Sequence, residues 1–152
     1  MRRGRTLLAA MLAAGALLAV PGPALTAPAA ARLTGGGTAD ISQVAMTVAV
    51  TDSGAASGSF LCLMAGRSAF AIADFGLAHV MAVHATPTSG SLSGTVMTFS
   101  GSGHLILDGK QKVAVDVEVW VDVATQTFQL TVHGVGTLPV ETLLTGRLAL
   151  RT

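Results

Sequence analysis

The feature that most constrains the fold is an almost perfect alternation of apolar and polar residues in "KVAVDVEVWVDV", residues 112–123. Every odd-numbered position from Val113 to Val123 is a valine, and the even-numbered positions include Lys112, Asp116, Glu118, Trp120 and Asp122. A period of two places alternate side chains on opposite faces of a β-strand, whereas a helix would distribute the valines around its circumference. The pattern therefore predicts a strand whose valine face lies in the core and whose other face meets solvent.

Further segments repeat this pattern. After "ATQT" (124–127) the alternation resumes, which predicts a hairpin, and "VAMTVAVT" (44–51) and "ETLLTGRLALRT" (141–152) predict a first and a last strand. "SFLCLMAG" (59–66) predicts a strand covered on both faces. "ARLTGGGTAD" (31–40), which comes before the first predicted strand, predicts a flexible lead-in. "GTVMTFSG" (94–101) and "HLILDG" (104–109) predict two strands joined by a Gly-Ser turn, with a tight turn at Asp108-Gly109.

Residues 68–86, "SAFAIADFGLAHVMAVHAT", fit two secondary structures. Their alternating alanines suit a strand, while the spacing of Leu77, Val80, Met81 and His84 also suits a helix. We expect strands, because the neighbouring segments need sheet partners. With no αβ alternation elsewhere, the chain is predicted to be all-β, an antiparallel barrel or sandwich of about seven to nine short strands.

The N-terminal region has the layout of a secretory signal peptide. A basic "MRRGR" precedes the apolar "TLLAAMLAAGALLAV", and "PGPALTAPAAA" supplies small residues for cleavage. An uncleaved membrane anchor is the alternative, but the apolar run is shorter than the roughly 20 residues that span a bilayer. We therefore predict a signal peptide over residues 1–31, cleaved after Ala29 or Ala31, and one extracellular domain over residues 32–152 with no membrane contact after cleavage.

Charge and cysteine content exclude several functions. After residue 31 the chain contains six basic and eight acidic residues. It has no basic cluster with interleaved aromatic residues that would suggest nucleic-acid binding. The only cysteine, Cys62, has no partner for an internal disulfide and lies among large apolar neighbours, which predicts a buried thiol rather than a nucleophile. The mature domain must therefore be stable through packing.

No catalytic or metal site emerges from residue spacing. His79 and His84 would face opposite sides of a strand, and His104 and His133 lie on other hairpins without ligand spacing. Carboxylates at alternate positions of a straight strand stand roughly 6.6 Å apart, which is poor geometry for calcium. "AGRSAF" around Ser68 lacks the last glycine of a nucleophile elbow, and "GSGH" (101–104) lacks the lysine of a phosphate loop. We predict a protein that is not an enzyme and needs no cofactor.

Several segments together carry a resemblance to a known family. They are "LTGGGT" (33–38), "TFSGSGHLILDG" (98–109), "VEVWVD" (117–122), "TFQLTVHGVG" (127–136) and "LLTGRLALR" (143–151). With these motifs the chain resembles the small Gly-rich secreted β-domains of bacteria of the post-COAP type. The resemblance implies an all-β fold without catalytic activity, and a different secreted β-barrel stays open as the alternative.

Two functions remain open. The first is a secreted β-domain with a structural or surface-interaction role toward an unidentified extracellular or cell-surface component. Its binding candidates are the outward residues of the central strand, Asp116, Glu118, Trp120 and Asp122, although Trp120 packing over Gln129 or Thr131 as a cross-strand cover is the simpler expectation. The second is a carrier of a small apolar ligand in a barrel interior, which the five phenylalanines would instead fill.

Overall fold

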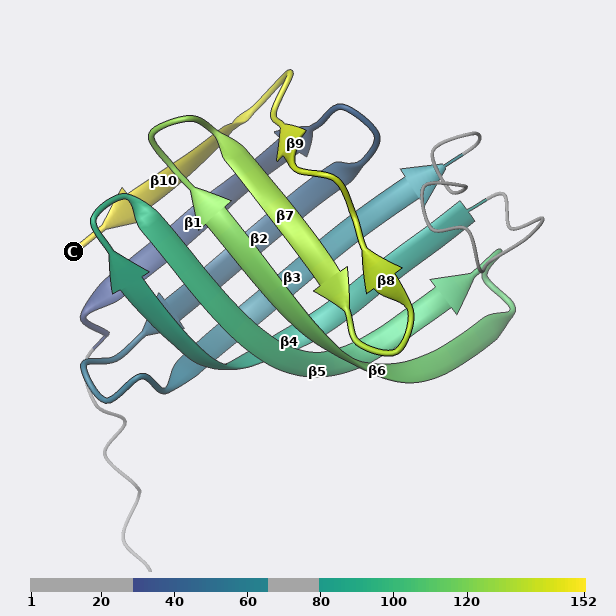
Figure 1. The fold of residues 1–152 in the computed structure, drawn as a ribbon, viewed down its shortest axis with the longest axis horizontal. Helices are drawn as coiled ribbons and strands as arrows, with labels where there is room; N and C mark the ends of the chain where they lie inside the picture. The colour runs from purple at the N-terminus through teal and green to yellow at the C-terminus, as the bar shows by residue number, and fades with distance from the viewer. Residues whose placement is uncertain (1–28, 66–79) are drawn as a thin grey trace, which may run out of the picture.

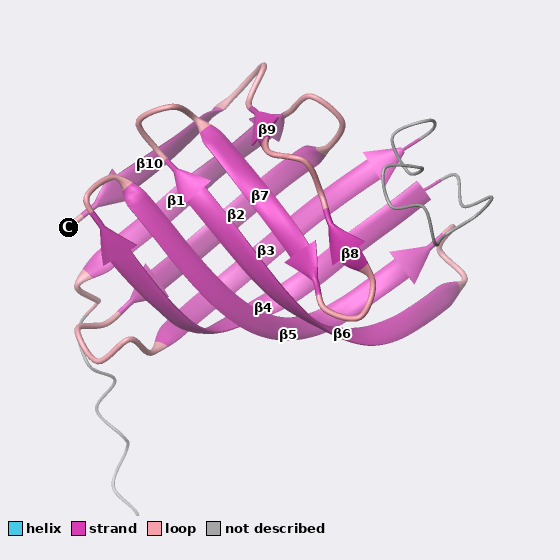
Figure 2. Cartoon of the chain, viewed as in Figure 1, coloured by secondary structure: helices cyan, strands magenta, loops and turns pink. Residues whose placement is uncertain are grey.

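The computed structural model describes residues 29–65 and 80–152, which form one curled antiparallel β-sheet with no helix in these ranges (Figures 1 and 2). The predicted all-β class is confirmed. The strands are β1 (Ala31–Thr38), β2 (Gln43–Val50), β3 (Ala56–Ala65), β4 (Val80–Ser93), β5 (Val96–Leu107), β6 (Gln111–Asp122), β7 (Thr127–Val132), β8 (Gly136–Thr137), β9 (Glu141–Thr142) and β10 (Arg147–Arg151).

The sheet is a meander that curls into a half-barrel. Strands β1 to β8 pair in chain order, β10 pairs with β1 at one edge, and β9 pairs with β7. In Figure 1, β6 and β7 cross over the layer formed by β1 to β4, so the two ends of the sheet enclose a common interior. Sequential antiparallel pairing of this kind needs only short connections, as the alternating segments predict.

The Gln126 side chain bridges the seam between β7 and β10. Gln126, in the β6–β7 loop, accepts a hydrogen bond from the Leu148 amide at 2.8 Å and donates one to the Leu148 carbonyl at 3.1 Å. Its own backbone carbonyl accepts the Leu143 amide at 3.0 Å. The Gln126 amide thus takes the place of a peptide group between β7 and β10, which gives this edge of β10 a partner.

The interior is a continuous apolar core. Val117, Val119 and Val121 are each at most 1% exposed, which confirms the predicted orientation of β6. The Phe60 and Phe99 rings pack edge to face with centroids 5.8 Å apart, an arrangement that aromatic pairs favour. The sheet therefore buries its apolar face as an ordinary protein interior does.

The prediction that the whole valine face of β6 is buried was wrong at one end. Val113 is 48% exposed, although Val115 further along is buried. Strand β7 pairs with β6 only from Val117 to Asp122, so the first part of β6 extends past its neighbour. Without that neighbour the described chain does not cover Val113.

Two glycine-rich segments also differ from the predictions. The expected lead-in is strand β1, and the expected Gly-Ser turn lies within the continuous strand β5. A Cβ atom on Gly35, whose φ is 137°, would lie 1.9 Å from the Arg147 carbonyl oxygen, and one on Gly103 would lie 1.9 Å from the His84 carbonyl oxygen. Glycine here permits close approach of neighbouring strands, whereas sequence reasoning took it as a sign of a loop.

Two further strand predictions were only partly right. "SFLCLMAG" contains most of β3, but only one face is buried, since Leu61 and Leu63 on the other face are half-buried. The expected first strand is β2, and the expected last strand is divided into β9 and β10.

The other turn predictions agree with the structure. Asp108 and Gly109 form the predicted turn with φ of 48° and 67°, and "ATQT" lies in the β6–β7 hairpin. From Val80 onward the ambiguous segment is strand, while its earlier part, including Ser68 and His79, lies outside the described residues. Most of the predicted signal peptide, residues 1–28, lies outside them as well. Within the described ranges no helix has the length and apolarity to cross a membrane.

Candidate functional site

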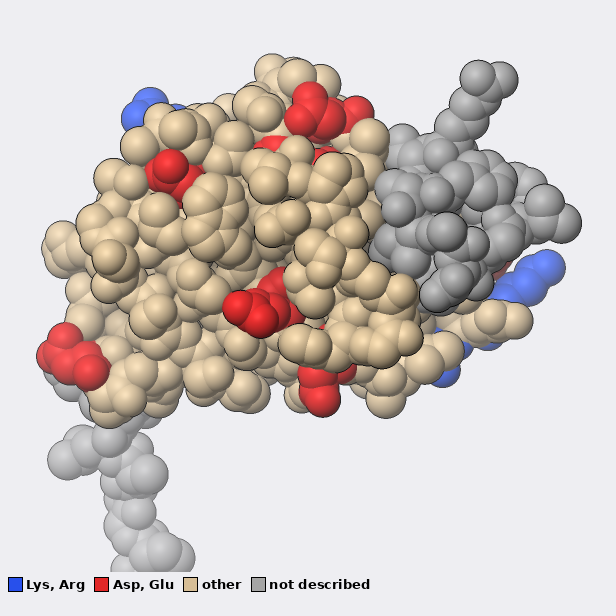
Figure 3. All heavy atoms as spheres, in the orientation of Figure 1, with Lys and Arg blue, Asp and Glu red and all other residues tan. Residues whose placement is uncertain are grey.

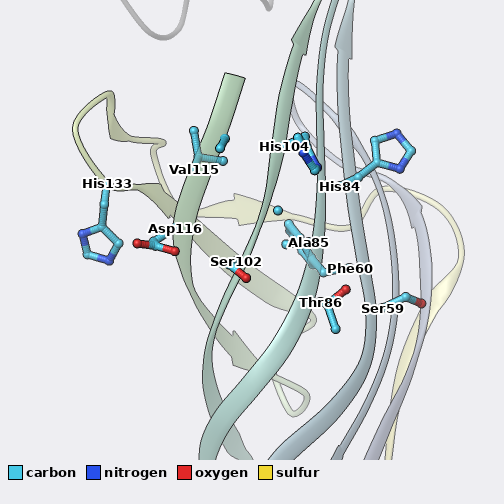
Figure 4. A pocket seen from close by; sticks show the side chains of 12 residues that line it. Ser59, Phe60, His84, Ala85, Thr86, Ser102, His104, Val115, Asp116 and His133 are labelled. Carbon is cyan, nitrogen blue, oxygen red and sulfur yellow. The ribbon is translucent and has the colours of Figure 1, made fainter. Parts of the chain in front are cut away.

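A groove of about 860 Å³ crosses the outer face of the sheet over β3, β4, β5 and β6 (Figure 4). The side chains beside it come from two outward-facing rows of residues that the strand register aligns. One row contains His84, His104 and Ala114, which are paired directly across β4, β5 and β6. The other row, which we call the polar row, contains Ser59, Thr86, Ser102, Asp116 and His133.

The floor of this outer groove is the row between those two. Phe60, Ala85, Gly103 and Val115 are paired in register across four strands. Phe60, Ala85 and Val115 are at most 9% exposed, because their side chains point to the core and only the backbone faces outward. Gly103 has no side chain at all. The groove therefore runs across the strands, and a ligand in it would meet polar side chains on both sides.

The polar side chains along the outer groove are available for binding. His84, His104, Thr86, Ser102 and Asp116 are all exposed, and none of their side chains forms a hydrogen bond or ion pair within residues 29–65 and 80–152. In Figure 4, His84 and His104 lie on neighbouring strands, while Asp116 and His133 lie close together on the other side of the view. Imidazole, hydroxyl and carboxylate groups together offer both donors and acceptors.

The same residue types could suggest catalysis or metal binding. A serine nucleophile needs a hydrogen bond to a base that a third group orients, and Ser102, His104 and Asp116 form no such bonds in this structure. Among the described residues, no three His, Cys, Asp or Glu side chains are placed to hold a metal ion. What the outer groove offers in the described residues is a set of hydrogen-bond donors and acceptors.

The four predicted binding residues separate into different environments. Asp116 lies in the outer groove. Glu118 is exposed between Ser100 and Thr131, and the half-buried Trp120 lies directly opposite Gln129, the neighbour expected for a cross-strand cover. At about 3.3 Å per residue, Trp120 stands roughly 13 Å from Asp116 along the same face of β6.

Asp122 has a local structural role. Its carboxylate accepts hydrogen bonds from Thr95 Oγ1 at 2.9 Å, the Ala124 amide at 3.0 Å and Thr125 Oγ1 at 3.1 Å. The bond from Thr95, followed by those from the β6–β7 loop, lowers the pKa of Asp122 below its usual value. Because its oxygens are already engaged in the turn, Asp122 contributes little to a binding surface.

Sequence reasoning missed most of the outer groove. Alternation within β4 places His84 and Thr86 outward, and alternation within β5 does the same for Ser102 and His104. That alternation is visible in the sequence, but it does not say which outward residues of the two strands lie opposite each other. Only the strand register reveals that His84 and His104 face each other.

The structure also contains a buried polar cluster that was not predicted. Glu141 is 0% exposed, and its Oε2 accepts hydrogen bonds from Ser42 Oγ at 2.8 Å and the Ile41 amide at 3.1 Å. Burial raises the pKa of Glu141. The adjacent Cys62 is buried as predicted, and burial raises the pKa of its thiol to about 12, so it is not a nucleophile at neutral pH.

Charges on the face drawn in Figure 3 are dispersed. Figure 3 shows acidic side chains at separate positions and few basic ones on the visible face.

No protein-family model matches the chain, and no curated protein or solved structure is significantly similar to it. The resemblance to post-COAP domains therefore stays a prediction.

Proposed function

We propose that this chain is an exported β-domain without catalytic activity, and that its outer groove binds an extended polar partner such as a glycan chain. The observation that carries the proposal is the alignment of exposed, unpaired polar side chains across neighbouring strands. Exposed polar side chains without hydrogen bonds inside the protein can replace their hydrogen bonds to water by hydrogen bonds to a ligand.

The spacing of the polar row supports an elongated ligand. Neighbouring strands lie about 4.8 Å apart, so a row that runs over β3 to β6 and ends at His133, just after β7, presents polar groups along roughly 19 Å. Its members carry three hydroxyls, one carboxylate and one imidazole, which suits a ligand rich in hydroxyl groups and without strong net charge. Trp120, on the same face, offers an aromatic surface beyond the outer groove.

Core packing favours this proposal over an apolar-ligand carrier. Phe60, Phe99 and Phe128 occupy the interior and are each at most 2% exposed, together with methionines and leucines from neighbouring strands. A carrier of this size needs interior space that side chains leave free. We therefore place binding on the outer surface.

Export is part of the proposal and has its own test. The Ala30 amide donates a hydrogen bond to the Val50 carbonyl at 2.9 Å, and Ala31 is buried in β1. Cleavage after Ala29 keeps both interactions, whereas cleavage after Ala31 removes them. Mass spectrometry of the mature protein should find Ala30 at the N-terminus, and an intact chain retained in the cytoplasm would contradict export.

Binding is tested with cello-, xylo- and chito-oligosaccharides as probes in calorimetric titrations. Ser102→Trp would fill the outer groove and should abolish binding, while Glu118→Gln on the same face should preserve it. Equal binding by both variants would place the site elsewhere. Turnover of any probe that disappears in Asp116→Asn would overturn the non-enzymatic proposal.

A further inference from the structure

The C-terminal strap, residues 138–146, is attached to the β1–β2 turn by a small number of polar contacts. The Thr142 amide donates to Asp40 Oδ2 at 2.7 Å, and the Leu144 amide donates to the Thr38 carbonyl at 2.8 Å. Glu141 makes the only buried attachment among these, through Ile41 and Ser42. Strand β10, which completes the seam with β7, follows directly after the strap.

The surroundings of the Glu141 carboxyl favour its neutral form. Its Oε1 has no hydrogen-bond partner within the described residues, and no cation there pairs with it. Within residues 29–65 and 80–152, the titratable groups that act on it are Asp40, whose negative charge opposes ionisation, and the buried Cys62, whose thiol is neutral. Phe128, paired with Glu141 across β7 and β9, offers no polar group. A buried charge without a counter-charge is costly, so burial raises the pKa of Glu141 and outweighs the hydrogen bonds from Ser42 and Ile41, which act in the opposite direction.

We propose that Glu141 is a proton-dependent latch, in which the neutral carboxyl closes the strap over the end of the sheet and its ionisation loosens the strap and the adjoining seam. This proposal is independent of ligand binding in the outer groove. A folded-state pKa above the unfolded value means that the folded protein binds the additional proton. The strap is therefore most firmly closed below the unfolded pKa of about 4.3 and loosens as pH rises through the folded pKa of Glu141.

The small number of glutamates allows the Glu141 carboxyl to be titrated directly. The chain contains two glutamates, the buried Glu141 and the exposed Glu118. Labelling glutamate with ¹³C at the carboxyl carbon gives two signals, which Glu118→Gln assigns. We expect the Glu141 carboxyl to titrate above the ordinary glutamate pKa of about 4.3, because it is buried. Titration of Glu141 at or below that ordinary value would overturn the latch.

Hydrogen exchange of the full domain tests the consequence for the strap. After correction for the intrinsic pH dependence of exchange, protection of the Ile41, Thr142 and Leu144 amides should fall with rising pH, by at most about tenfold per pH unit for one proton. Glu141→Gln, which keeps an acceptor and has no charge, should abolish this dependence, while Glu118→Gln and Cys62→Ala should retain it. The proposal would be refuted if amide protection in the wild type did not change with pH, or if Glu141→Gln kept the same pH dependence as the wild type. If Glu141→Gln does not fold, the carboxyl titration alone decides.

Discussion

The long hairpins β4–β5–β6 and the C-terminal strap are stabilised in different ways. The hairpins form ladders in which each strand has twelve or more residues, and they bury alternate apolar side chains in one core. The strap contains one two-residue strand and buries Leu138, but its attachment to the neighbouring loops depends on individual polar groups, among them Glu141 and the backbone carbonyl of Gln126. Regular alternation thus produces a robust scaffold, whereas closing that scaffold depends on a few specific side chains.

The largest effect should come from placing a charge in the hairpin core. Val117 is 1% exposed, so Val117→Asp should lower the free energy of unfolding by several kcal/mol, on the order of 4, because the buried carboxylate has no partner. Its exposed neighbour serves as control, and Glu118→Lys should cost less than about 0.5 kcal/mol. Urea denaturation measures both. Equal destabilisation by the two changes would mean that the orientation of β6 is wrong.

The seam is the next most sensitive feature. Gln126→Ala removes both side-chain bonds to Leu148 and leaves the part-buried backbone amide and carbonyl of Leu148 without these partners. This should lower the free energy of unfolding by about 2 kcal/mol. Gln129→Ala, which removes one bond to the Leu138 carbonyl, should cost about half as much. Thermal or urea unfolding compares the two. If Gln129→Ala proved the more damaging, the Gln126 bridge would not be what closes the sheet.

Trp120 should have a moderate effect on stability. Because it is half-buried and paired with Gln129, Trp120→Ala should cost about 1 kcal/mol through lost cross-strand packing. Oligosaccharide binding should be unchanged if Trp120 serves only as a cover. A variant of wild-type stability that loses binding would instead make Trp120 part of the binding surface.

The smallest expected effect concerns how stability changes with pH. The hairpins, through Asp122, and the strap, through Glu141, should contribute pH dependences of opposite sign. The pKa of Asp122 is lowered, so its stabilisation is present above the unfolded pKa of about 3.9 and is lost as pH falls through the folded pKa. Glu141, with a raised pKa, contributes in the opposite direction. Unfolding measured against pH should therefore show a shallower acid limb in Asp122→Asn. An identical acid limb would mean that the turn bonds contribute nothing measurable.

The sequence predicted those features that depend on local periodicity. Alternation around Val117 and Val119 identified strand, face and hairpin, because side-chain direction in a strand follows from position alone. It failed at Gly35 and Gly103, where glycine serves close strand contact rather than a turn. Burial of Val113 was also predicted wrongly, since burial depends on how far a neighbouring strand extends.

The candidate site was less predictable than the fold for a related reason. The outer groove requires the registers of β3 through β6 together, and a one-residue change in any register would send its side chains to the other face. Glu141 was not singled out, because nothing in "PVETLL" marks a glutamate as buried. Both features arise from contacts between segments far apart in the chain, such as Ser42 with Glu141.

The most direct test of the central claim, that the outer groove is the binding surface, is to map amide chemical shifts of the ¹⁵N-labelled domain during titration with chito-oligosaccharides. We predict saturable shifts concentrated at His84, Ser102, His104 and Asp116, with little change at the core valines of β6. Saturable shifts confined to Phe99, Phe128 and their interior neighbours would contradict the claim and indicate a ligand carried inside the sheet.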